Sequence, residues 1–180
     1  MKQKRRESIP AVLTAVFAVL TCTLAIINRL RSAAEIFSVK PSQVQEVRLQ
    51  RFGVTRAAVM QEPDKTFEYA CASSAPIGQV MISAFSENAL LPVDQEAAEK
   101  VFQEKDSVSP ACVGFFVQDK KNGEAAPNAR WITAESYPDQ NILRFYSVDP
   151  TSGESIERYF LCGAACMLTA DNVEVFLNNI

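Results

Sequence analysis

The sequence predicts an α+β fold in which a long N-terminal helix packs on a small antiparallel β-sheet domain. Two observations predict the helix: residues 9–27 are apolar and uncharged, and apolar residues then recur at helical spacing to about residue 39. A third observation predicts the sheet, because the remaining chain consists mostly of short apolar or alternating segments separated by turn residues. With 180 residues, the chain has room for one membrane segment and one domain.

The apolar run at residues 9–27 predicts a membrane helix. A helix rises about 1.5 Å per residue, so these 19 residues nearly cover the ~30 Å hydrocarbon core of a bilayer. We therefore assign residues 1–8 to a basic cytoplasmic leader and residues 9–28 to a transmembrane helix. The excess of Lys and Arg before the run places the N-terminus inside and exports the rest of the chain. Positions assigned to this membrane helix include Ile9, Val12, Val16, Leu20, Leu24 and Ile27.

A cleaved signal peptide is the alternative for the same segment. The small residues 32–34 resemble a cleavage site. The apolar run is longer than the core of a typical signal peptide, and Arg29 and Arg31 separate it from that site. These two features favour an uncleaved anchor.

Residues 29–40 are predicted to continue the same helix as an amphipathic stem. Apolar residues keep a three- and four-residue spacing as far as Phe37, and Pro41 disfavours helical geometry in the residue before it. We expect one helix of about thirty residues, half in lipid and half packed on the domain. Residues 41–180 then form the exported antiparallel α+β domain.

Within the domain, most segments are predicted to be strands. The early strand-like segments are 44–49, 54–60 and 66–72, which suggest a hairpin, and 80–85 is a further apolar run in this stretch. Residues 95–102 are predicted as a short helix capped by Asp94. The later strand candidates are 111–118, 130–135, 142–148, 155–161 and 173–177. Turn residues lie between them at 122–123, 137–139 and 149–153.

Composition excludes several function classes. The net charge is -3 and the only dense basic run is the leader, so we predict no nucleic-acid partner. Histidine is absent, which removes the commonest general base and the commonest zinc ligand. No nucleophile elbow or phosphate-binding Gly-rich loop is present among the six glycines. We therefore predict no enzyme, no catalytic residue, no metal and no cofactor.

Four cysteines in the exported part are candidates for disulfide bonds. They are Cys71, Cys112, Cys162 and Cys166. An even number suits pairing in an oxidising compartment, either between residues 162 and 166 or from these out to 71 and 112. A zinc site made of all four is the alternative, and the spacing of the last two is not that of the usual redox motif.

Acidic, basic and aromatic residues in the C-terminal third of the sequence suit either a binding site or a purely structural role. The acids Asp139, Asp149, Glu154, Glu157 and Asp171 suit either a calcium site or solvated turns. The side chains of Arg144, Tyr146, Arg158 and Tyr159 suit either a binding surface or the solvent face of a sheet. Trp131, the only tryptophan, is predicted to be a packing anchor. For each group we prefer the structural role to the binding site.

The order of segments resembles that of a known family. A basic leader, an apolar segment with a stem, strand segments at 141–148 and 155–161, and a closing segment at 168–176 with a leucine, an Asn-Val pair and a phenylalanine are similar to those of type IV pilin-like proteins, particularly minor pseudopilins of type II secretion systems. The chain lacks the glycine that follows the family's leader and the glutamate near the start of the family's helix. The resemblance implies a pilin-like fold and a role in assembly, without catalytic residues.

These observations predict a non-enzymatic, single-pass component of an envelope assembly, such as a minor pseudopilin of a type II secretion or type IV pilus-like system. It would lie in the cytoplasmic membrane with its domain periplasmic or extracellular. Its partners would be membrane lipid and the membrane helices of other subunits. The alternative is a membrane-anchored extracytoplasmic binding or sensor domain for a small ligand or cell-wall component. A concave pocket with converging polar groups would favour that alternative.

Overall fold

The computed structural model describes residues 8–27, 30–50, 67–104, 110–118, 120–121, 124–125, 129–138, 140–163 and 165–180. Its elements begin with α1 (Ser8–Ile27), α2 (Ala33–Ile36), the 3-10 helix η1 (Pro41–Gln43), β1 (Val44–Gln50), β2 (Tyr69–Ala72), α5 (Pro76–Glu87), β3 (Leu90–Pro92) and α6 (Gln95–Glu104). They continue with β4 (Ala111–Val117), β5 (Lys120–Lys121), β6 (Glu124–Ala125), β7 (Arg130–Ser136), β8 (Ile142–Val148), β9 (Ser155–Cys162) and α7 (Ala170–Asn178).

The chain forms two units, residues 1–30 and residues 31–180. The first contains α1, a 20-residue helix whose side chains are all exposed over residues 14–25. Among the residues whose side chains the structure describes, which in α1 are 14–25, we find no helix that is both long and apolar enough to cross a membrane. The second unit is the folded domain, and it begins at Arg31.

The predicted stem at residues 29–40 is wrong as a helix. Over the described residues 30–40, the only α-helical part is the four residues of α2, which begin at a new N-cap. The Ser32 hydroxyl accepts a hydrogen bond from the Glu35 amide, and the Glu35 carboxylate accepts one from the Ser32 amide, so this capping box starts a separate helix. Ser38 then has a φ of 53°, which right-handed helical geometry does not allow. The stem's apolar residues pack instead in the domain core.

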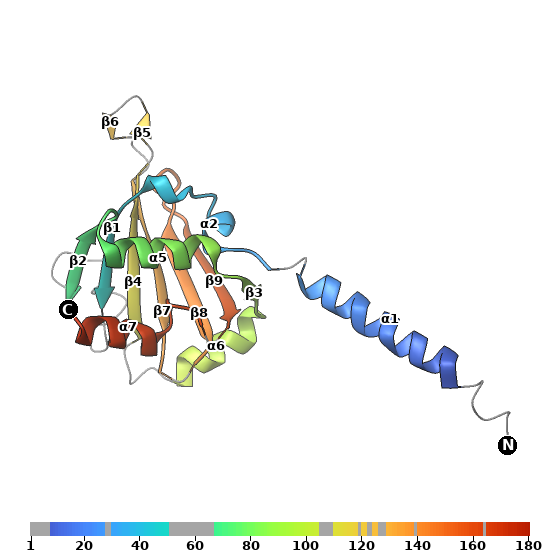
Figure 1. Cartoon of the computed structure of the whole chain (residues 1–180). Helices are drawn as coiled ribbons and strands as arrows, with labels where there is room; N and C mark the ends of the chain where they lie inside the picture. The colour runs from blue at the N-terminus through green and yellow to red at the C-terminus, as the bar shows by residue number, and fades with distance from the viewer. Residues whose placement is uncertain are drawn as a thin grey trace, which may run out of the picture. The chain divides into compact units, whose positions relative to one another are not determined.

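One antiparallel sheet organises the domain (Figure 1). Within the described residues it has seven strands in the order β2-β1-β4-β7-β8-β9-β3. The predicted antiparallel sheet is therefore confirmed. Strands β7, β8 and β9 follow one another in sequence and pair in that order, whereas β3, from earlier in the chain, pairs with β9 and forms one edge of the sheet. The short hairpin of β5 and β6 projects beyond the sheet.

The two faces of this sheet differ in chemistry. We call the side that packs against α2, α5 and α7 the first face, and the opposite side, where α6 packs, the second face. The first face is apolar, and its buried side chains include Val47, Leu49, Val113, Phe115, Ile132, Leu143, Phe145 and Phe160. The second face carries Arg48, Cys112, Trp131, Glu135, Arg144, Glu157 and Tyr159 at the alternate positions.

Most of the predicted strands are confirmed. Strands β1, β4, β7, β8 and β9 match the predicted segments to within one residue at each end, and β2 is the second half of the predicted segment 66–72. The segment 54–60 lies outside the described residues. The predicted helix at 95–102 is confirmed as α6, with the Asp94 carboxylate accepting a hydrogen bond from the Ala97 amide at 3.1 Å.

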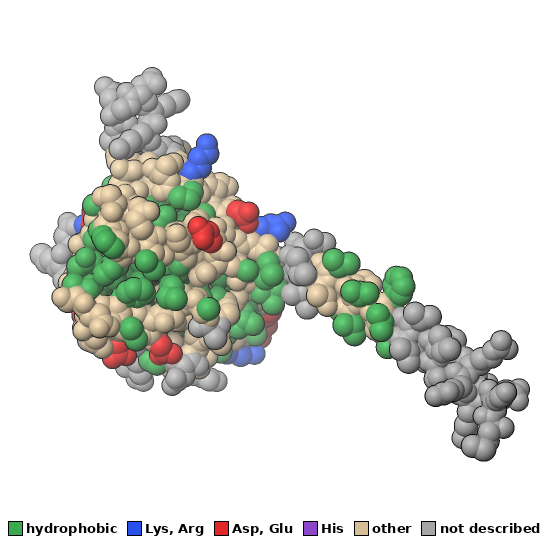
Figure 2. Space-filling view, viewed as in Figure 1, with side chains coloured by type: hydrophobic (Ala, Val, Ile, Leu, Met, Phe, Trp, Pro, Cys, Tyr) green, Lys and Arg blue, Asp and Glu red, His purple; other side chains and the backbone are tan. Residues whose placement is uncertain are grey.

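Two segments that were read among the strands are helices. The run 80–85 lies in α5, where Pro76 occupies the first turn, a position that proline favours. The segment 173–177 lies in α7, which follows Thr169 and carries Asp171 in its first turn. Figure 2 shows hydrophobic side chains gathered over the α5 and α7 side of the domain.

Candidate functional site

A row of polar side chains crosses the second face from β1 to β9. Register places Gln50, Cys112, Glu135, Arg144 and Tyr159 opposite one another on five successive strands. All five side chains are largely buried, although all of them are polar or ionisable. A buried polar row of this kind is stable only when its members satisfy one another's hydrogen-bonding groups.

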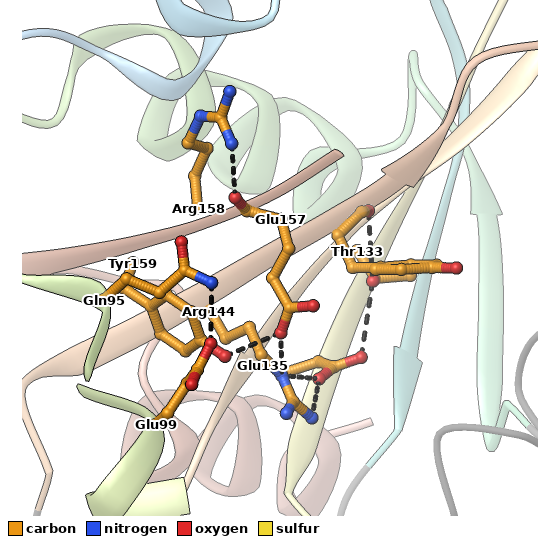
Figure 3. Close-up of polar contacts among 9 residues, drawn as sticks. Gln95, Glu99, Thr133, Glu135, Arg144, Glu157, Arg158 and Tyr159 are labelled. Carbon is orange, nitrogen blue, oxygen red and sulfur yellow. Dashed lines mark hydrogen bonds and ion pairs between the residues drawn. The ribbon is translucent and has the colours of Figure 1, made fainter. Parts of the chain in front are cut away.

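Arg144 is the centre of this row (Figure 3). Its guanidinium contacts the Glu135 carboxylate through Nε at 2.7 Å and through a terminal nitrogen at 2.5 Å. A second carboxylate, from Glu157, lies 3.9 Å from Nε. Burial opposes the charge on Arg144, but the charge and hydrogen bonds of Glu135, helped by Glu157, outweigh burial and raise the pKa of Arg144.

Tyr159 joins the row to helix α6. Its hydroxyl donates a hydrogen bond to the Glu157 carboxylate at 2.6 Å, and its ring packs edge-on against Phe102 at 5.6 Å between centroids. Burial and the bond to Glu157 raise the pKa of Tyr159 to about 12. The phenol is therefore protonated at neutral pH, as a donor. Phe102 also lies 4.6 Å from the Arg144 guanidinium, a cation–π contact.

A pocket of ≈ 190 Å³ opens beside this network. Its lining residues are Glu99, Phe102, Gln103, Arg144, Glu157 and Tyr159. Helix α6 supplies the first three and strands β8 and β9 supply the others. Glu99 accepts a hydrogen bond from Gln95 at 2.6 Å, which holds it on the pocket side of α6 (Figure 3). Carboxylates around a ring and a phenol suit a ligand that carries a positive charge and hydrogen-bond donors.

At the other end of the second face, Trp131 is a packing anchor, as predicted. Its ring lies 5.2 Å from that of Phe116 and stacks at 6.1 Å on Phe67. The Arg48 guanidinium lies 4.7 Å from the Trp131 ring. Nearby, Oε1 of Gln50 is buried and has no hydrogen-bond partner within the described part of the chain.

A second hollow of ≈ 180 Å³ is lined by residues that include Ser38, Arg130 and Asp149. Arg130 donates to the Phe37 carbonyl at 2.8 Å. The Asp149 carboxylate accepts hydrogen bonds from the Thr151 and Ser152 amides, which lower its pKa.

The predicted turn at residues 149–153 is therefore confirmed, with Gly153 at a φ of 73°. Among the side chains that the structure describes, no three potential metal ligands come together. Asp139, one of the acids considered for calcium, lies outside the described residues.

The cysteines are free thiols in the described structure. Cys112 lies on the second face, where burial and the charge of Glu135 raise its pKa well above the ordinary value. Cys71 lies on the first-face side of the edge strand β2, two strands away. Cys162 and Cys166 lie together on the first-face side, with their side chains hydrogen-bonded. Of the predicted pairings, the structure brings together only this last pair.

Sequence alternation located part of the site. Arg144 and Tyr159 were considered for a binding surface, and the structure places them side by side. Arg158 lies on the other face, where it opposes Phe145. The sequence did not indicate Glu135 or Phe102, because strand register and the position of α6 bring them to Arg144.

Comparison with known proteins identifies no relative. No model of a protein family matches this sequence, and no curated protein or solved structure shows significant similarity to it. The resemblance to pilin-like proteins remains a prediction.

Proposed function

We propose that the chain is a non-enzymatic, single-pass membrane protein whose extracytoplasmic domain binds an amine-bearing small ligand or cell-wall component. The observation that carries this proposal is the pocket between α6 and the second face. Glu99 and Glu157 supply carboxylates and the Phe102 ring supplies an apolar wall, while the charge of Arg144, which also lines the pocket, is balanced by its contact with Glu135. An amine would exchange its hydration for these acceptors and for contact with the ring.

The arrangement of the chain supports tethering. Apolar side chains are exposed all along the described part of α1, including Phe17 at 71% and Leu24 at 59%. Such exposure is unfavourable in water and favourable in lipid. The domain closes its core with residues of α2, α5 and α7. An apolar helix followed by a self-contained domain is typical of a tethered binding protein.

A second candidate is assembly through α1, as in the predicted pilin-like role. The exposed residues Val16, Phe17, Val19 and Leu20 point in different directions around the helix, which would let helices of other subunits pack on several sides. The stem that such an assembly uses to cover its sheet is replaced here by α2, α5 and α7. We therefore place assembly second.

Ligand binding is tested with cadaverine and with its uncharged diol analogue, titrated into the full-length protein in detergent. We expect saturable binding of the diamine alone. Glu99→Gln should weaken it by roughly tenfold, the effect of losing about 1.4 kcal/mol of binding free energy. Glu96→Gln is the matched control, because Glu96 lies on the same helix and pairs with Lys100 at 3.1 Å. Equal effects of the two variants, or no saturable binding, would contradict the proposal.

Tethering is tested by membrane fractionation of the native protein at alkaline pH. The double variant Val16→Arg/Leu20→Arg should leave the membrane, because an arginine at the centre of a spanning helix costs about 2.5–3.5 kcal/mol. Its control is Val80→Arg/Leu161→Arg, which changes the same residue types at exposed positions of the domain. Equal membrane fractions for the two variants would argue against anchoring by α1.

The same preparation distinguishes the second candidate. Cys22 is exposed on α1, so mild oxidation in the membrane should crosslink two copies if their helices pack together. Crosslinking with loss of amine binding would put assembly first.

A further inference from the structure

Cys162 and Cys166 form a close pair of thiols at the end of β9. Cys162 is the last residue of the strand and pairs with Leu90 of β3. The chain then turns back, with the Cys166 amide donating to the Gly163 carbonyl at 3.0 Å. This turn brings the two side chains into hydrogen-bonding contact. Both residues are buried, at 4% and 3% exposure.

The surroundings of the pair favour a thiolate on Cys166. The Asn88 side-chain amide donates a hydrogen bond to its Sγ at 3.2 Å. The Cys162 thiol is also directed to it, and the Leu168 amide adds a third donor. These contacts lower the pKa of Cys166 against the effect of burial, whereas the same contact and burial raise the pKa of Cys162. The pair thus has an attacking sulfur and a protonated partner.

Exposed residues of the turn after β9 lie next to the buried pair. Gly163 faces open space, since a Cβ built there would have no atom within 4 Å, and Ala165 is exposed. A hollow of ≈ 390 Å³ is lined by residues that include Asn88, Ala165 and Met167.

We propose that Cys162 and Cys166 form a reversible thiol–disulfide site that reacts with disulfides of the glutathione class. The Cys166 thiolate attacks one sulfur of the oxidant, forming a mixed disulfide and releasing one thiolate. The Cys162 thiol then loses its proton, and its sulfur attacks that of Cys166. The second oxidant thiolate leaves, so that two protein thiols become one disulfide and one oxidant disulfide becomes two thiols.

Asn88 is a positioning residue in this reaction. It ends α5, and its side chain is the described donor from that helix to Cys166. The sulfur of a disulfide is a poorer acceptor than a thiolate. Oxidation therefore weakens the contact between the end of α5 and the turn after β9.

The test equilibrates the full-length protein with mixtures of reduced and oxidised glutathione, followed by acid quenching, alkylation in denaturant and mass spectrometry. We expect oxidation to remove two of the five alkylation sites, with peptide mapping placing the bond between Cys162 and Cys166. Cys71→Ser and Cys112→Ser serve as controls and should leave this bond intact. Alkylation of all five cysteines in the most oxidising mixture, or a bond mapped elsewhere, would overturn the proposal.

A kinetic test uses Asn88→Ala, with Asn179→Ala as a control at the exposed side-chain amide that caps the C-terminus of α7. Without the Asn88 donor, the pH profile for mixed-disulfide formation should shift to higher pH, and the rate at neutral pH should fall several-fold. An unshifted profile would remove Asn88 from the mechanism. Because the wild-type mapping does not depend on any variant, poor folding of a cysteine variant would not affect the result.

Discussion

The two faces of the sheet bury side chains by different physical means. The first face packs Phe115, Phe145 and their neighbours against α2, α5 and α7, so each contact gains from apolar area removed from water. The second face buries Glu135 and Arg144, whose desolvation is offset mainly by their contact with each other. Substitutions on the first face should therefore act in proportion to lost volume. Substitutions on the second face should act according to which polar group is left without a partner.

The largest effect should come from the adjacent residues Phe115 and Phe116, which point to opposite faces of β4. Phe115 is fully buried, whereas Phe116 is partly exposed beside Trp131. We expect Phe115→Ala to lower the free energy of unfolding by about 3–5 kcal/mol. Phe116→Ala should cost less than half as much. Urea denaturation of both variants checks this, and equal losses would show that the second face is packed as tightly as the first.

Arg144→Ala should cost about 3 kcal/mol, because it leaves the Glu135 carboxylate buried without its cation. Replacing both residues with apolar ones, as in Glu135→Leu/Arg144→Met, should recover much of that loss. Arg158→Ala, at an exposed position of β9, should change stability by less than about 0.5 kcal/mol. If the double variant is less stable than Arg144→Ala, the Glu135–Arg144 pair stabilises the fold by more than the neutralisation of two buried charges.

Two glycines, one in α5 on the first-face side and one on the second face, differ in the room that is available for an added Cβ. A Cβ on Gly78 in α5 would lie 2.6 Å from the Ala72 carbonyl, a backbone atom. On Gly114 it would lie 3.0 Å from the tip of the Phe67 ring, which is easier to displace. We expect Gly78→Ala to cost about 2–3 kcal/mol and Gly114→Ala about 1 kcal/mol. Gly163→Ala, which meets no atom, is the control for thermal melting.

The smallest effect concerns Tyr159 and appears only in alkali. Its pKa is raised from 10.0 to about 12 in the folded protein, so the unfolded phenol ionises first as pH rises. The stability that the folded state gains from keeping this phenol neutral is therefore fully present below pH 10 and is lost as pH rises toward about 12. Tyr159→Phe should flatten the dependence of stability on pH in this window. Tyr69→Phe, on the first face, is the comparison, and a flattening of equal size there would contradict the assignment.

Sequence alternation predicted the strands of both faces because period-two burial is a local property. In β8, residues 142–148 alternate between half-buried and buried positions, and the predicted bounds agree with the structure. The antiparallel class followed from turns such as the one at Asp149. Local signals were sufficient for these elements.

The helices were harder to predict, because capping signals competed with apolar runs. Ser32-Ala-Ala-Glu35 is a capping box in the sequence, yet the apolar spacing around it suggested one continuous stem. Pro76 marked the start of α5, and Asp171 marked the first turn of α7, within segments whose β-branched residues suggested strands. In these segments the helix-start signals were the better guide.

The candidate site depended on register, which the sequence does not specify. Alternation placed Arg144 and Tyr159 on one face, but their partners come from β7 and α6. Glu135 reaches Arg144 because the pairing of β7 with β8 sets them opposite each other. A shift of one residue would have placed Ala134 there.

The domain is joined to α1 at Arg31, which gives the fold a mechanical property. The Arg31 amide donates to the Leu90 carbonyl at 3.2 Å, and the Leu90 amide donates to the Arg31 carbonyl at 2.9 Å. Leu90 begins β3, the edge strand held to the sheet by β9. A pull on the chain ahead of Arg31 would therefore first meet this two-bond bridge at the rim of the sheet, before it reached α2. The bridge should yield at low force, and the load would then pass through α2 to β1, which lies inside the sheet between β2 and β4.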